Sequence, residues 1–105
     1  RAALAEGLAF ARATGADPAR ALEIVRAGRA YSRVMDAKGP RMLRRDFKPV
    51  ARLAQHLKDV RLILKAAHRV HLTVPLSAQH AKLLARVAAR GRGDLDNSAV
   101  ILAYD

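Results

Sequence analysis

The chain has 105 residues, which suits one domain with a single hydrophobic core. It contains no cysteine, and this excludes disulfides, thiolate nucleophiles and metal sites with cysteine ligands. Its 20 Lys and Arg residues outnumber 9 Asp and Glu residues, giving a formal net charge of +11 that attracts polyanions but does not specify a fold.

Apolar residues make up 51% of the chain, but aromatic residues only 4%. The core must therefore consist of Leu, Val, Ile and Ala, a composition that suits closely packed helices. No apolar run approaches the roughly 20 residues that span a bilayer, so we expect a cytoplasmic protein. The sequence starts at Arg1 within a helical pattern that has no cap, and we expect it to be a piece of a longer protein.

The first two predicted helices cover Ala2–Ala13 and Pro18–Ala27. Gly15 follows the first helix as a left-handed stop. The second helix has proline at its first position, directly after Asp17, whose carboxylate can cap free backbone N–H groups. Its inward face is predicted to carry Ala21, Leu22, Ile24 and Val25.

A third helix is predicted from Arg29 to Lys38. It is expected to stop at Gly39-Pro40, because proline lacks an N–H group and disfavours a helical conformation in the residue before it. The following segment, 41–49, has no sustained helical period and is predicted to be a loop. It carries a basic cluster that consists of Arg41, Arg44, Arg45 and Lys48.

The strongest helical period runs from Val50 to His71. Apolar residues recur there at spacings of four and three, which places them on one buried stripe of a helix. These residues are Leu53, Leu57, Val60, Leu64 and Ala67. Lys58 falls on a second, basic face, and Asp59 falls on a third, partly apolar face. A carboxylate on such a face needs partners, and Arg52 and His56 are within reach.

Two further helices complete the prediction. Ser77 is expected to cap a helix from Ala78 to Ala89, which Gly91 and Gly93 break. Asp96 is expected to cap a last, short helix that holds Val100, Ile101 and Leu102. No alternating apolar stretch is long enough for a pair of strands, so the predicted fold is all-α with about six helices.

The histidines and the positive charge each raise another class of site, a metal site and a binding surface for polyanions. His56, His68 and His71 stand at helical spacings without a further ligand at metal spacing, so no metal site is predicted. The positive charge leaves open a basic helical module that binds nucleic acid or an acidic protein by counterion release. No DNA- or RNA-reading motif accompanies the charge, which makes nucleic acid the less favoured partner.

Four phrases, taken in order, resemble the C-terminal domain of the β-hydroxyacid dehydrogenases, the 3-hydroxyisobutyrate dehydrogenase family. They are ALAEGLAFARATGADP, GPRMLRRDF, HLKDVRLILKAA and GDLDNSAVI, and they cover nearly the whole chain. The GPRM phrase followed by L-K-D-x-R-L is the specific part of this resemblance. The Ala-rich helices by themselves would indicate little.

The resemblance implies a two-domain oxidoreductase. An N-terminal Rossmann domain would hold NAD or NADP, while residues 1–105 would form an all-α bundle like the C-terminal domain of 6-phosphogluconate dehydrogenase. This bundle closes the active-site cleft and forms the subunit interface of a homo-oligomer. The implied reaction is hydride transfer between a small hydroxy-acid substrate and its semialdehyde. For the subunit interface we expect apolar faces around Leu4, Leu8, Leu84 and Ala88.

The sequence matches only the helical part of such an enzyme. It lacks the G-x-G-x-x-G phrase and the K-x-x-x-N phrase with the family's catalytic lysine, which is expected upstream of Arg1. We therefore expect this segment alone to be inactive and to bind no cofactor. By resemblance, Lys58 matches a lysine that contacts the cofactor, and Asp59 matches an acid that fixes the helix carrying this lysine. The basic cluster is expected to belong to a solvated loop, and the alternative is that it faces the cofactor phosphates or an acidic substrate in the full-length enzyme.

One departure from the family pattern concerns the substrate pocket. Many members have an aromatic residue where this chain has Val50-Ala51. The identity of the hydroxy acid, and the choice between NAD and NADP, therefore stay open. A purely structural dimerisation domain stays open for the same reason.

Overall fold

A computed structural model describes all of residues 1–105. The chain forms five α-helices, α1 (Ala2–Ala13), α2 (Pro18–Ala27), α3 (Arg33–Arg44), α4 (Leu53–Arg69) and α5 (Pro75–Val87). A π-helical turn, η1 (Ala88–Arg92), and a 3-10 helix, η2 (Asn97–Tyr104), follow. The only β-type contact is an isolated antiparallel bridge between Arg52 and Asp96, so the predicted all-α fold is confirmed. None of the helices combines the length and apolar character needed to cross a membrane.

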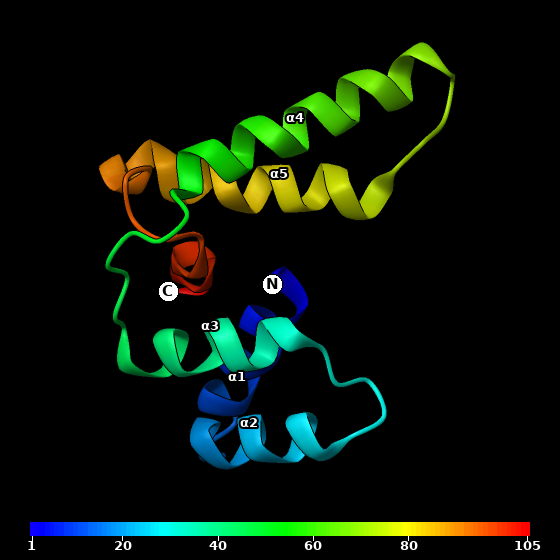
Figure 1. Cartoon of the computed structure of the whole chain (residues 1–105). Coiled ribbons are helices and arrows are strands. Elements are labelled where there is room, and N and C mark those ends of the chain that lie inside the picture. Colours follow the sequence, from blue (N-terminus) through cyan, green and yellow to red (C-terminus); the bar gives the residue numbers. More distant parts are fainter.

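The short helix η2 lies at the centre of the fold. Figure 1 shows the antiparallel hairpin of α4 and α5 on one side of it and the group of α1, α2 and α3 on the other. η2 contacts α1, α3, α4 and α5, and every residue from Asn97 to Ala103 is buried. Arg86 and Arg90 close its end by donating hydrogen bonds to the carbonyls of Ala103 and Leu102, at 3.2 and 2.9 Å.

The core is aliphatic, as the composition predicts. Its largest fully buried apolar side chains are Met42, Leu53, Leu84, Val87 and Val100. Burying a side chain of this size contributes roughly 1.5–3 kcal/mol. Leu4, Leu8 and Leu84 all belong to this internal core. These three side chains thus find apolar partners within the chain itself, and the interface expected around them stays a prediction.

The predicted boundaries of α1 and α2 are confirmed. Gly15 adopts a left-handed φ of 84° after α1. The carboxylate of Asp17 accepts a hydrogen bond from the backbone N–H of Ala19 at 3.0 Å and so caps α2. These boundaries were predictable because a few adjacent residues determine them.

The predicted inward face of α2 is only partly correct. Leu22 is buried, whereas Ile24 is 64% exposed and Val25 is 40% exposed. Helix α2 lies at the outside of the fold, where it contacts α1 and α3 along one side (Figure 1). A helix with neighbours on a single side buries a narrow stripe, and Leu22 lies at the middle of that stripe.

Helix α3 contains Gly39 and Pro40, so the prediction that they stop the helix is wrong. A proline ring disfavours a helical conformation in the preceding residue partly by meeting that residue's Cβ, and Gly39 has none. Gly39 also packs closely on α2. A Cβ added to it would lie 2.7 Å from Cδ1 of Leu22. The missing side chain therefore allows both the helical backbone and the contact between α2 and α3.

Other predicted boundaries shift by part of a helix. Helix α3 begins at Arg33 instead of Arg29, and it continues to Arg44, so the first four residues of the predicted loop 41–49 are helical. The loop begins instead at Arg45, which adopts a left-handed φ of 55°. Ser77 does not cap α5, because the helix already begins with Pro75 at its first position. Gly91 lies within η1 and kinks the backbone there with a left-handed φ of 75°.

Candidate functional site

Helix α4 carries both candidate residues, Lys58 and Asp59. Its buried residues are Leu53, Leu57, Val60 and Ala67, and Leu64 is partly buried. This confirms the predicted stripe, which packs mainly against α5, the antiparallel neighbour of α4 (Figure 1). The other sides of α4 are left to solvent or to another domain.

Lys58 lies on an exposed side of α4, directly after the buried Leu57. Six ion pairs form in the chain, and Lys58 takes part in none of them. Its ammonium group therefore has hydrogen-bond capacity available for a ligand. Because Leu57 is buried beside it, the backbone that carries Lys58 is held by the core.

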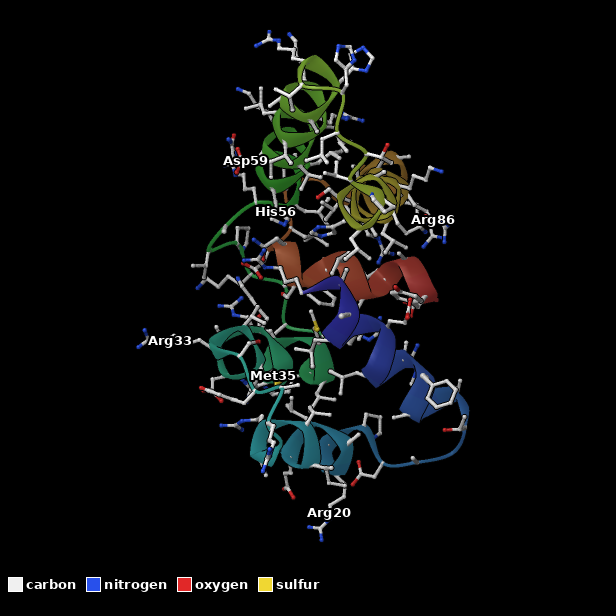
Figure 2. The ribbon with its side chains drawn as sticks, turned by 90° about the vertical axis from the view of Figure 1, so that its right-hand side faces the viewer. Arg20, Arg33, Met35, His56, Asp59 and Arg86 are labelled. Carbon is white, nitrogen blue, oxygen red and sulfur yellow. The ribbon has the colours of Figure 1, made fainter.

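Asp59 is exposed, so the predicted partly buried position is wrong. Neither predicted partner reaches it. Arg52 lies 3.9 Å from Asp94, and His56 contacts Arg1. The carboxylate instead accepts a hydrogen bond from the side-chain amide of Gln55, one turn earlier, at 3.4 Å. Figure 2 shows Asp59 on the outer side of α4 and His56 on the side that faces the interior.

The beginning of α4 is held by a remote segment of the chain. No side chain caps the helix, and its first two backbone N–H groups have no acceptor within α4. The N–H of Leu53 donates to the carbonyl of Leu95, and the N–H of Ala54 donates to the carbonyl of Gly93, both at 2.8 Å. The segment 93–97 thus does the work of an N-cap and fixes where α4 starts.

The same segment contains the most deeply buried charge of the chain. The carboxylate of Asp96 is fully buried and pairs with Lys38 of α3, whose Nζ lies 3.0 Å from each carboxylate oxygen. Asp96 also accepts hydrogen bonds from the backbone N–H groups of Val50, at 3.3 Å, and Ala51, at 3.1 Å. Ser98 donates to it with its N–H at 3.0 Å and its hydroxyl at 2.6 Å.

These contacts keep Asp96 ionised. Burial alone raises the pKa of a carboxyl group, but the hydrogen bonds from Ser98, Lys38 and the Ala51 amide outweigh burial, and the pKa of Asp96 lies well below its usual range. The expected cap of the last helix is thus present, through Ser98. The wider role of Asp96 and its pairing with Lys38 were missed, although the lysine before GPRM and the aspartate in GDLDNSAVI are visible in the sequence.

A second polar cluster joins α1, α4 and α5. The guanidinium of Arg1 lies 3.1 Å from Nε2 of His56, and the rings of His56 and His80 meet edge to face with centroids 5.0 Å apart. Burial, and next the positive charge of Arg1, lower the pKa of His56 to about 4. Both rings are therefore neutral at pH 7, and they pack between the helices.

The basic cluster of the segment 41–49 is partly used within the chain. Arg45 makes a bidentate pair with the carboxylate of Asp105 at 2.8 and 2.9 Å. Arg41 donates to the carbonyl of Lys48 at 2.7 Å. Two of the four basic side chains thus hold the loop and the C-terminal end, which leaves Arg44 and Lys48 exposed.

Known proteins similar to this chain include dehydrogenases and also the cytokine-like nuclear factor N-PAC of Homo sapiens, which is 34% identical over 98% of this chain and 19% of that protein. A family model described as NAD-binding of NADP-dependent 3-hydroxyisobutyrate dehydrogenase matches residues 1–104. The chain is 38% identical over 103 residues to 2-hydroxy-3-oxopropionate reductase of Escherichia coli K12, covering 98% of this chain and 35% of that protein. It is 35% identical to probable 3-hydroxyisobutyrate dehydrogenase-like 1, mitochondrial, of Arabidopsis thaliana, covering 97% of this chain and 30% of that protein.

A crystal structure of 3-hydroxyisobutyrate dehydrogenase from Salmonella typhimurium has the same fold. Its TM-score with this chain is 0.92 at 24% sequence identity, and the likeness covers 96% of this chain and 35% of that one. The chain thus spans about a third of the length of these relatives. With a family model matched from the first residue to the last but one, the chain belongs to the family of the NAD-binding domain of NADP-dependent 3-hydroxyisobutyrate dehydrogenase.

Proposed function

We propose that residues 1–105 form the C-terminal domain of an NAD(P)-dependent dehydrogenase that interconverts a small 3-hydroxy acid and its semialdehyde. In this proposal the domain closes the active-site cleft against an N-terminal Rossmann domain of the same enzyme, and the catalytic lysine lies upstream of Arg1. The family match over the chain and the greater length of its relatives support this arrangement. The cofactor, NAD or NADP, would be held mainly by the other domain.

Lys58 is the residue through which this domain would contact the cofactor. The assignment rests on the place of Lys58 in the L-K-D-x-R-L phrase shared with the family. An exposed ammonium group without an ion-pair partner, placed after a buried leucine on a helix whose start is fixed, supports it. The nicotinamide, when bound, supplies hydride-transfer chemistry. The part of Lys58 is to donate a hydrogen bond to a cofactor or substrate oxygen and to stabilise negative charge there.

Asp59 would support Lys58 through the helix. Its hydrogen bond with Gln55 joins two successive turns of α4 on the exposed side. Interactions of this i, i+4 kind stabilise a helix by roughly 0.2–0.5 kcal/mol. In the proposed enzyme the remaining acceptor capacity of the carboxylate is available to the Rossmann domain.

The test is Lys58→Met in the full-length enzyme, with Lys65→Met as the matched control. Lys65 lies on the same helix, is also exposed and also forms no ion pair. A hydrogen bond to a charged group is worth about 1.5–3 kcal/mol, so Lys58→Met should lower kcat/KM about 10- to 150-fold. It should also weaken cofactor binding. Lys65→Met should change neither quantity.

Thermal melting separates a functional role from a structural one. Both lysine variants should melt within about 2 °C of the parent protein, because exposed substitutions change stability by less than about 0.5 kcal/mol. Asp59→Asn should melt like them and lose less activity than Lys58→Met. Full activity of Lys58→Met, or equal losses in Lys58→Met and Lys65→Met, would contradict the role assigned to Lys58.

The subunit contact is proposed at the α4–α5 hairpin. Five large apolar side chains there are between 52% and 87% exposed: Leu62, Ile63, Val70, Leu72 and Leu76. Figure 1 shows the connection between α4 and α5 projecting away from the other helices. Exposed apolar groups that gather in one region mark a surface that favours association. We place the homo-oligomer interface here instead of at the buried Leu4 and Leu8.

A further inference from the structure

We propose that Asp96, held by Lys38, is a positioning residue that sets the Val50–Ala51 backbone and thereby governs how tightly the enzyme binds its hydroxy acid. The proposal rests on the proposed function and on the resemblance, which implies that Val50-Ala51 stands where many family members carry an aromatic residue close to the substrate pocket. No motif or comparison assigns this role to Asp96. The geometry of its carboxylate carries the inference.

The two oxygens of Asp96 serve different segments. Oδ2 accepts both hydrogen bonds from Ser98 and caps η2. Oδ1 accepts the N–H groups of Val50, at 3.3 Å, and Ala51, at 3.1 Å, in the loop before α4. The ammonium of Lys38 lies 3.0 Å from both oxygens and neutralises the buried charge. An ordinary helix cap needs only the Oδ2 half of this arrangement.

Two backbone hydrogen bonds also join the loop before α4 to residues 96 and 97, one at each end of the segment 47–51. The N–H of Asp96 donates to the carbonyl of Phe47 at 2.9 Å, and the N–H of Asn97 donates to the carbonyl of Ala51 at 2.8 Å. Segment 47–51 therefore takes its backbone course from residues 96 and 97. Phe47 packs against the core, whereas Val50 and Ala51 are exposed, Val50 to 75%.

A fixed backbone with free side chains is the arrangement that a specificity-determining loop requires. Reacting groups must be held to within a fraction of an ångström, and such precision comes from supporting residues that are themselves locked. Buried ion pairs contribute little net stability compared with apolar residues of the same volume. The pair of Lys38 and Asp96 is thus better explained by the segments that it orders than by the stability that it adds.

The first experiment compares Asp96→Asn with Leu84→Ala in the full-length enzyme. Asn keeps the shape and one acceptor oxygen but removes the charge that orders Lys38 and the loop amides. Leu84 is also fully buried, in α5, and makes none of these hydrogen bonds, so Leu84→Ala is a control for lost stability alone. Steady-state kinetics well below the melting temperature would measure KM separately for the hydroxy acid and for the nicotinamide cofactor.

We expect Asp96→Asn to raise KM for the hydroxy acid about 10- to 100-fold, since misplacement by about 1 Å has an effect of this size. KM for the cofactor should stay within about twofold, and Leu84→Ala should change neither value. If Asp96→Asn and Leu84→Ala behave alike, or if Asp96→Asn raises both KM values equally, Asp96 has no positioning role toward the substrate. If Asp96→Asn does not fold, the Lys38→Met/Asp96→Asn double variant replaces it, because this variant leaves no unpaired buried charge.

A second measurement does not depend on catalysis. Amide hydrogen exchange of the 105-residue chain should show faster exchange at Val50 and Ala51 in Asp96→Asn, and unchanged rates there in Leu84→Ala at matched stability. Unchanged exchange at both amides in Asp96→Asn would overturn the inference even in an active enzyme. Absence of any NAD(P)-dependent dehydrogenase activity in the unsubstituted full-length enzyme, with selective exchange at Val50 and Ala51, would instead overturn the proposed function.

Discussion

Substitution of Gly39 by alanine tests the contact on which the joining of α2 and α3 depends. Gly39 lies inside α3, directly before Pro40, and a Cβ built on it would lie 2.7 and 2.8 Å from the two Cδ atoms of Leu22. Distances below 3.0 Å are essentially never seen for real Cβ atoms, so Leu22 must move. Leu22 is only 4% exposed, which leaves it little room to do so.

The size of the effect follows from two opposing terms. Alanine is favoured over glycine in a helix by about 1 kcal/mol. Adding a methyl group to a well-packed site costs about 1–3 kcal/mol, and the added Cβ also meets the ring of Pro40. We expect Gly39→Ala to destabilise the chain by about 1–2 kcal/mol, which lowers the melting temperature by roughly 4–8 °C.

Gly7→Ala provides the matched control, because Gly7 is also helical and a Cβ there would meet no atom within 4 Å. This variant should gain about 0.5–1 kcal/mol. Urea unfolding of both variants, alone and in a Leu22→Ala background, measures the coupling between positions 22 and 39. Gly39→Ala should become less unfavourable once Leu22 is shortened. If Gly39→Ala is as stable as Gly7→Ala, the packing argument is wrong.

Two further predictions concern pH and self-association. The folded-state pKa of His56 is about 4 and its unfolded value is 6.5, so protonation favours the unfolded chain. Stability should be full above pH 6.5 and decline by about 1–2 kcal/mol as the pH falls to 4, after a discount for the half-exposed ring. Urea unfolding of His56→Gln should show a smaller decline, and an equal one would contradict this assignment. Sedimentation at tens of micromolar should show oligomers that Ile63→Glu/Leu76→Glu converts to monomers, and a monomeric parent chain would remove the proposed interface.

The parts of the fold that were predicted correctly depend on adjacent residues. Asp17 and Pro18 start α2 through one local hydrogen bond, and the spacing of Leu53, Leu57 and Val60 identifies the buried side of α4. Helix α3 was predicted to stop at Gly39-Pro40, but Gly39 lacks the Cβ that the ring of Pro40 would meet, and it packs on Leu22 of another helix. A breaker motif such as Gly39-Pro40 indicates a local preference, and tertiary packing reversed it.

The same distinction applies to the candidate site. The helical period correctly placed Lys58 on an exposed side of α4, although Lys58 directly follows the buried Leu57 in the sequence. The partners of Asp96 beyond its cap with Ser98 were not predictable, since Lys38 and the Val50–Ala51 amides come from two other segments of the chain. No regular spacing in the sequence indicates that these residues, far apart in the chain, are in contact. The burial of Asp59 was predicted wrongly because the apolar residues near it on the wheel, such as Ile63, are themselves exposed.

The hydrogen bonds that begin α4 also affect the order in which the chain folds. Leu53 and Ala54 obtain their acceptors from Leu95 and Gly93, so α4 has no proper start until residues 93–95 have been synthesised. Closing so long a loop costs entropy that the local contacts of α1, α2 and α3 avoid. We therefore expect these three helices to associate early and the docking of segment 93–97 to limit the folding rate. A nascent chain that ends before Gly93 lacks η2, so the sides of α1, α3, α4 and α5 that pack against η2 would be exposed. Such a chain would be a natural client for chaperones.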